Sequence, residues 1–143
     1  MTHVHRQALV RHTPQQMFDL VNDVEAYPAR FAWCAGATVL ERDDAHVVAR
    51  LDLRFAGVVQ HFVTRNAIEH PSRIGMQFVE GPFRSLTGDW TFRALGDDGC
   101  KVELTLDFEV ANWLTGAALR MGLQKLADQM VDDFVAESNH AYG

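Results

Sequence analysis

The sequence predicts an α+β fold in which a curved antiparallel sheet wraps around one long C-terminal helix. Two observations lead to this prediction. Between residues 47 and 110, apolar and polar residues alternate with a period of two, which is typical of strands with one buried face. After Asn112 the apolar residues recur with a helical period, so we expect one helix over about 112–139. Short turns favour antiparallel pairing, and only this helix is long enough to cover the buried face of the sheet.

The residues that precede the sheet predict a capped helix. Thr13 can cap a helix, Pro14 suits the first helical position, and Gln16 completes a capping box. Pro28 disfavours a helical backbone at the residue before it. We therefore expect the first helix to end near Tyr27 or to break there into a second, short helix.

The alternating region predicts a sheet of six or seven strands. Turn signals separate the apolar segments, among them Gly81-Pro82 and Gly96-Asp97-Asp98-Gly99. The clearest strand runs from Cys100 to Val110, where every second residue is apolar and the residues between them are polar. The expected strands cover about 4–10, 47–55, 58–68, 74–78, 90–94 and 100–110.

Length and composition predict one soluble domain over residues 1–143. Hydrophobic residues make up 48% of the chain and charged residues 22%, which is the balance of an ordinary globular protein. No stretch approaches the roughly 20 apolar residues that span a bilayer, and the first residues lack the apolar segment of a secretory signal. We therefore expect a cytoplasmic protein.

The charged and metal-binding residues argue against nucleic-acid binding and against a metal site. The net charge is −6 and the 13 basic residues are scattered, so we expect no DNA partner and only weak contact with bare RNA. Cys34 and Cys100 match no metal-binding spacing, and we expect both to be reduced thiols in the apolar core. His3 and His5 share a strand face but lack the i, i+4 helical spacing of a zinc motif.

A curved sheet around one helix can enclose a cavity, because the concave face and the helix need not interdigitate fully. The same apolar residues can also fill a solid core, and periodicity alone leaves both interpretations open. Trp33, Phe83 and Trp113 stand at turns or element ends, where they can close the mouth of a cavity or plug the end of a core. The candidate walls share the apolar face of a strand or of the last helix: Phe55, Phe78, Trp90, Phe108, Leu119, Leu123 and Met130.

Few polar residues are candidates for chemistry in such a cavity. Arg65 and Asn66 interrupt an apolar strand and can contact the polar head of a ligand or, alternatively, form structural hydrogen bonds. The sequence contains no nucleophile elbow, no phosphate-binding glycine loop and no His-Glu-x-x-His motif. No acid–base pair can be assigned either. We therefore expect a binding protein without catalytic residues and without a required cofactor.

Several segments occur in an order and spacing that resemble a known family over essentially the whole chain. These segments are Asp23–Pro28, Thr64–Asn66, Glu80–Trp90, Leu106–Asn112, Met130–Phe134 and Tyr142-Gly143. Together they resemble the coenzyme Q-binding START-like family, which includes the bacterial ribosome association toxin and proteins labelled oligoketide cyclase or lipid-transport. Gly81-Pro82-Phe83 followed by Gly88-Asp89-Trp90 is fairly specific in combination.

The resemblance implies a helix-grip fold with a hydrophobic tunnel between the sheet and the last helix. It implies binding of ubiquinone or a related lipid in support of respiration, with a membrane surface or respiratory components as partners and a location peripheral to the inner membrane. For other members it implies a ribosomal subunit as partner and interference with subunit association. A polyketide cyclase or aromatase is the third alternative. A pocket for such a small molecule usually measures about 300–1,000 Å³.

One segment departs from the family pattern. The family tends to have Tyr-Pro-x-Phe-Leu-Pro-Trp-Cys, whereas this chain has Tyr27-Pro28-Ala29-Arg30-Phe31-Ala32-Trp33-Cys34. Arg30 stands where a large apolar residue is usual, and the second proline is missing. We therefore expect the loop after the first helices to be more mobile.

Overall fold

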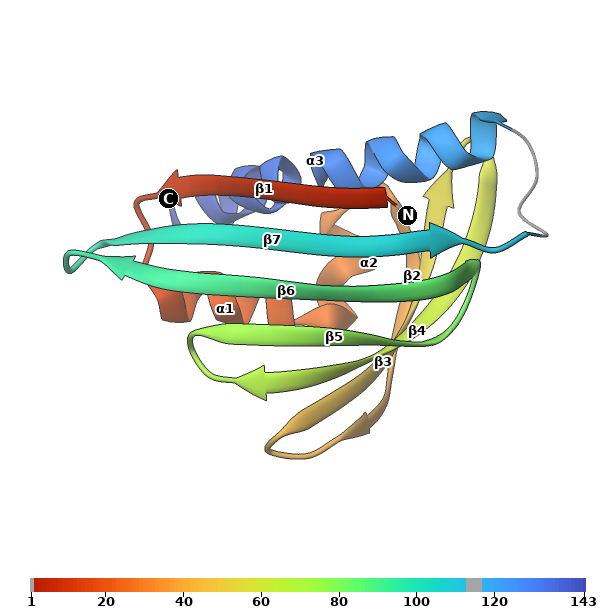
Figure 1. The fold of residues 1–143 in the computed structure, drawn as a ribbon. Coiled ribbons are helices and arrows are strands. Elements are labelled where there is room, and N and C mark those ends of the chain that lie inside the picture. Colours follow the sequence, from red (N-terminus) through yellow and green to blue (C-terminus); the bar gives the residue numbers. More distant parts are fainter. Residues whose placement is uncertain (1, 113–116) are drawn as a thin grey trace.

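Helices cover one face of an antiparallel sheet in a computed structural model that describes residues 2–112 and 117–143 (Figure 1). Within these ranges the sheet has seven strands in the order β1-β7-β6-β5-β4-β3-β2, each antiparallel to its neighbours. In chain order the elements are β1 Thr2–Val10, α1 Pro14–Asn22, the 3-10 turn η1 Val24–Ala26, α2 Tyr27–Arg30, β2 Cys34–Arg42, β3 His46–Phe55, β4 Val58–Glu69, β5 Arg73–Glu80, β6 Phe83–Leu95, β7 Gly99–Val110 and α3 Ala117–Tyr142. This architecture confirms the predicted fold class, a curved antiparallel sheet that grips a C-terminal helix.

Strand β7 has the buried face that its alternation predicts. Cys100, Val102 and Leu104 each expose 0% of their surface, while Lys101 and Glu103 between them are partly exposed on the other face. Full burial of a valine or leucine side chain contributes about 1.5–3 kcal/mol relative to exposure. The strand pairs with β1 on one side and with β6 on the other, so this apolar row lies inside the sheet rather than at an edge.

The predicted capping box at the start of α1 is confirmed. The Thr13 hydroxyl accepts a hydrogen bond from the Gln16 backbone N–H at 3.1 Å, and the Gln16 side chain accepts one from the Thr13 N–H at 2.9 Å. A second short helix, α2, begins at Tyr27, whose φ of −55° and ψ of −43° are helical. The predicted break into a second, short helix is therefore confirmed, although Tyr27 itself adopts helical angles despite the preference that Pro28 imposes. Pro28 lies in the first turn of α2, where its missing N–H costs nothing, and the Tyr27 hydroxyl donates to the carbonyl of Val21.

Helix α3 is displaced from the predicted range of 112–139. Asn112 lies in a turn, the described part of the helix begins at Ala117, and the helix continues to Tyr142. The additional residues at its end move Asp132 and Glu137 away from the negative end of the helix dipole. Because the dipole acts mainly within the last turn, it disfavours these carboxylates less than the shorter helix would.

The two cysteines are free and buried. Burial raises the pKa of both thiols, that of Cys100 to about 11, so little thiolate forms at neutral pH and both react slowly. In residues 2–112 and 117–143, no group of three metal-binding side chains lies together. No helix in those ranges is long and apolar enough to cross a bilayer.

Candidate functional site

A largely apolar cavity of about 100 Å³ lies between the concave face of the sheet and the helices. Strands β3 to β7 form one wall, and α3, the end of α1 and the segment 24–33 form the other. Seven aromatic side chains line it among the described residues: Tyr27, Trp33, Phe62, Phe83, Trp90, Phe108 and Phe134. Such a lining offers a ligand mainly hydrophobic contact, which is non-directional and grows with the apolar area buried.

The structure brings most of the predicted wall residues to this cavity. Those that line it are Trp33, Phe83, Trp90, Phe108, Leu123 and Met130. Phe55 and Phe78 do not, which corrects two of the predicted positions. Phe55 packs against the α3 backbone at Gly122, where an added Cβ would lie 3.4 Å from its ring, and the Phe78 ring packs on Phe83 at 5.9 Å between centroids. Trp113 and the side chain of Leu119 lie outside the described residues.

The cavity is smaller than the range of about 300–1,000 Å³ expected for a small-molecule pocket. Its lining includes Met76 and Met130, both half-buried, whose unbranched side chains adapt to space better than branched or aromatic ones. A ligand larger than a few atoms therefore has to displace these side chains.

The polar groups of the cavity wall lie mainly on β4. Thr64 and Asn66 are both buried, and the Thr64 hydroxyl donates to the Asn66 side-chain oxygen at 3.0 Å. Both line the cavity, as predicted for Asn66. Arg65, the other candidate for the polar head of a ligand, does not line the cavity, because successive residues of a strand point to opposite faces. Arg65 is exposed on the outer face, in a shallow depression that it shares with His46 and other residues.

Tyr27 carries the one ionisable side chain among the described residues that line the cavity. Its hydroxyl is buried and donates to the Val21 carbonyl. Burial raises the pKa of this hydroxyl far above its usual range, and the nearby Cys34 and Asp23 raise it further. The hydroxyl therefore stays neutral at physiological pH.

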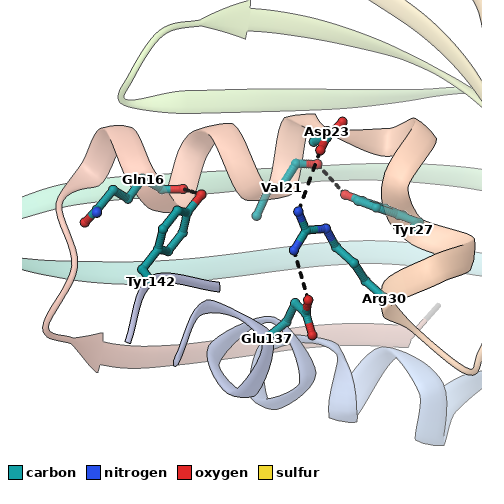
Figure 2. A network of polar contacts seen from close by, with 7 residues as sticks. All are labelled: Gln16, Val21, Asp23, Tyr27, Arg30, Glu137 and Tyr142. Carbon is teal, nitrogen blue, oxygen red and sulfur yellow. Dashed lines mark hydrogen bonds and ion pairs between the residues drawn. The ribbon is translucent and has the colours of Figure 1, made fainter. Parts of the chain in front are cut away.

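Polar contacts join the segment 23–33 to α3, and those of Arg30 are shown in Figure 2. The Arg30 guanidinium lies between two carboxylates, with Nη1 at 2.9 Å from Glu137 Oε1 and Nη2 at 3.9 Å from Asp23 Oδ2. The Trp33 indole N–H donates to Asp133 at 3.0 Å. We name Arg30–Glu137 and Trp33–Asp133 together the clasp. Arg30, which stands where the family usually has an apolar residue, thus forms an ion pair with the C-terminal helix. The mobility expected for the loop that follows it stays a prediction.

Trp33 borders both the inner cavity and a second space on the outside. It lines the cavity and also an outer recess of about 410 Å³ that is bordered by Arg30, Asp133, Glu137 and His140. Its ring stacks on Phe31 at 4.8 Å with 12° between the planes. Partial burial raises the pKa of the Asp133 carboxyl, and the hydrogen bond from Trp33 acts in the opposite direction.

Sequence reasoning missed both acidic members of the clasp. Asp133 and Glu137 are four residues apart and therefore share a helix face, which is the one signal that the sequence offers. Nothing in the sequence indicates that this face meets a segment located about a hundred residues earlier. Phe134 was also not predicted as a wall residue, although it lies on the apolar stripe of the helix.

A curved seven-stranded antiparallel sheet that closes on a C-terminal helix defines the START-like, helix-grip class of proteins. The chain belongs to the family described as polyketide cyclase/dehydrase and lipid transport, whose model matches residues 10–135. This membership confirms the resemblance seen in the sequence.

Three comparisons show which known proteins the chain is similar to. The chain is 40% identical over 143 residues to the ribosome association toxin RatA of Vibrio cholerae, and the match covers 100% of this chain and 99% of the relative. It is 25% identical over 133 residues to the mitochondrial coenzyme Q-binding protein COQ10 homolog B of Xenopus laevis, covering 90% of this chain and 54% of the relative. The ZhuI aromatase/cyclase from Streptomyces sp. R1128 superposes with a TM-score of 0.83 at 18% identity, covering 96% of this chain and 93% of the other, a likeness of fold alone.

Proposed function

We propose that this protein binds and carries a neutral hydrophobic small molecule in the inner cavity, and that it does not catalyse a reaction. Ubiquinone or a related quinone is the preferred class. The observation that carries the proposal is the lining of the cavity, which is apolar except for a few neutral groups. A membrane surface or respiratory components at the inner membrane are the partners that would load and unload such a carrier.

The lining favours a ligand without charge. An ion transferred into this cavity would lose its hydration, and among the described lining residues no arginine, lysine, histidine or carboxylate would compensate it. A quinone ring is flat, apolar over most of its surface and carries oxygen acceptors, so it matches aromatic walls with one polar pair. The relative named as a coenzyme Q-binding protein supports the same class.

The same lining disfavours a cyclase or aromatase reaction. Such chemistry needs a group that gives or takes a proton near the substrate. Among the described lining residues only Tyr27 is ionisable, and its hydroxyl is bonded to a backbone carbonyl with a pKa too high for a base at neutral pH.

The proposal predicts saturable binding of a ubiquinone analogue with a decyl tail. Because Trp33 and Trp90 line the cavity, a bound quinone should quench the intrinsic fluorescence of the protein. A ligand of this size gains about 0.3 kcal/mol per non-hydrogen atom, which gives a Kd on the order of 10–100 µM. Native mass spectrometry should show one quinone per chain. Quenching that does not saturate, together with no adduct in the mass spectrum, would contradict the proposal.

Interference with ribosomal subunit association is the second candidate function. The 40% identity to the ribosome association toxin over the whole chain favours it. The net charge of −6 argues for contact with ribosomal proteins rather than with bare RNA, so the effect should depend little on salt. With purified ribosomal subunits, we expect a stoichiometric amount of the protein to lower the fraction of associated ribosomes in a sucrose gradient. An unchanged gradient at a tenfold excess would exclude this function.

A further inference from the structure

We propose that Thr64 and Asn66 make the cavity selective for uncharged ligands that carry a hydrogen-bond-accepting oxygen, such as ketones and quinones. This inference rests on the proposed function and assigns its selectivity to one residue pair. Asn66 is the donor that contacts the ligand, and Thr64 is the positioning residue that orients it.

The geometry of β4 sets the orientation of the Asn66 amide. Thr64 and Asn66 are two residues apart on one strand and therefore share its inner face. The hydroxyl of Thr64 occupies the amide oxygen of Asn66 through a hydrogen bond of 3.0 Å. Because the oxygen is already engaged and Asn66 lines the cavity, the amide NH₂ is the group that is left to contact a ligand.

Burial makes this NH₂ group matter for selectivity. Asn66 exposes only 8% of its surface and Thr64 only 6%, so bulk water has little access to the pair. A ligand that covers this NH₂ without accepting from it leaves a donor without a partner, which is unfavourable, whereas an acceptor oxygen placed there forms the hydrogen bond. A ligand with an oxygen at this point of the wall therefore binds more tightly than an isosteric hydrocarbon, which cannot accept the hydrogen bond.

The same pair cannot replace the hydration that an anionic ligand would lose in the cavity. One neutral amide donates two hydrogen bonds at most, and no cationic side chain is present among the described lining residues. A carboxylate with the same shape as a ketone would leave most of its hydration unreplaced. The wall therefore distinguishes three ligands of one shape: a ketone, a hydrocarbon and a carboxylate.

Acetophenone, isopropylbenzene and benzoate provide this matched series, because all three are small and nearly isosteric. We expect acetophenone to bind the wild-type protein about tenfold more tightly than isopropylbenzene, the worth of one hydrogen bond to a buried donor. Benzoate at pH 7.5 should bind at least about a hundredfold more weakly than acetophenone. Amide chemical shifts in a titration followed by NMR give the affinities. The Asn66 side-chain NH₂ protons should move downfield with acetophenone and not with isopropylbenzene.

Variants of the pair test the assignment. Asn66→Leu keeps the approximate volume and removes the donors, so the ratio of the two affinities should fall to about one. Thr64→Val frees the amide to rotate and should lower the ratio about threefold, and it tests the proposal even if Asn66→Leu fails to fold. Thr38→Val is the matched control for Thr64→Val, since Thr38 is exposed on β2 and is not part of the cavity lining, and it should leave the ratio unchanged.

The outcomes separate this inference from the function on which it rests. If isopropylbenzene binds the wild-type protein and acetophenone binds no more tightly, the selectivity is refuted while the apolar cavity stands. A tenfold ratio that survives in both Asn66→Leu and Thr64→Val would also overturn the assignment. If neither compound binds the wild-type protein, both the inference and the proposed cavity function fail.

Discussion

Replacement of Met130 by glutamate is expected to abolish quinone binding and to leave the protein folded. Met130 lines the cavity from α3 and is half-buried, so a carboxylate at this position can reach water in the empty protein. A quinone that enters the cavity would remove that water from the charged group, at a cost of several kcal/mol. The Kd for the decyl-tailed quinone should therefore rise at least about a hundredfold, measured by tryptophan quenching, with an unchanged circular dichroism spectrum.

Gln129→Glu is the control for this variant. Gln129 precedes Met130 on the same helix but is exposed, so the substitution adds the same charge without placing it in the cavity. Its quinone affinity should stay within about twofold of the wild type. Retention of binding in Met130→Glu would show that the ligand lies elsewhere. If Met130→Glu unfolds and the wild type binds no quinone, the cavity is a packed core and the carrier function fails.

Replacement of Phe134 by alanine is expected to give a large loss of stability. Phe134 exposes 1% of its surface, and its ring centroid lies 4.6 Å from that of Phe31, 5.1 Å from Trp90 and 5.4 Å from Tyr27. Truncation of a buried phenylalanine costs about 3–5 kcal/mol, because the transfer free energy is lost and a cavity remains. Urea unfolding at 25 °C should show this decrease in the free energy of unfolding.

Met121→Ala provides the comparison on the same helix. Met121 is 70% exposed, and its truncation should change the free energy of unfolding by no more than about 0.5 kcal/mol. A Phe134→Ala variant that loses less than about 1 kcal/mol would mean that the aromatic contacts around α3 do not hold the helix against the sheet. Since domains are stable by about 5–15 kcal/mol, a loss in the predicted range removes a large share of the total.

The fold could be predicted from the sequence wherever burial is periodic. In β7 the alternation from Cys100 to Val110 decides by itself which side faces the core, and Thr13 with Gln16 decides where α1 begins. The break into a second short helix at Tyr27 was predicted as well, but the helical angles of Tyr27 were not, because its tertiary contacts override the local preference before proline.

The candidate site was less accessible to such reasoning, because it depends on distances between elements. Periodicity places Phe55 on an inward face but does not reveal that its ring lies close to α3 at Gly122 rather than in the cavity lining. Arg65 was proposed as a ligand contact for a different reason, because the alternation of strand faces was not applied to it. If Asn66 faces the cavity, its neighbour Arg65 has to face outward. The ion pair of Arg30 with Glu137 joins residues that no local pattern connects.

The position of Trp33 between the inner cavity and the outer recess bears on how fast a bound molecule can be exchanged. Because its indole borders both spaces, we expect its rotation to open a passage between them with every strand of the sheet still paired. That rotation breaks the hydrogen bond to Asp133 and the stacking on Phe31, each worth about 1 kcal/mol. Global unfolding requires several times as much free energy. For the proposed carrier function, we therefore expect ligand exchange to depend on side-chain motion in the native state rather than on unfolding of the sheet.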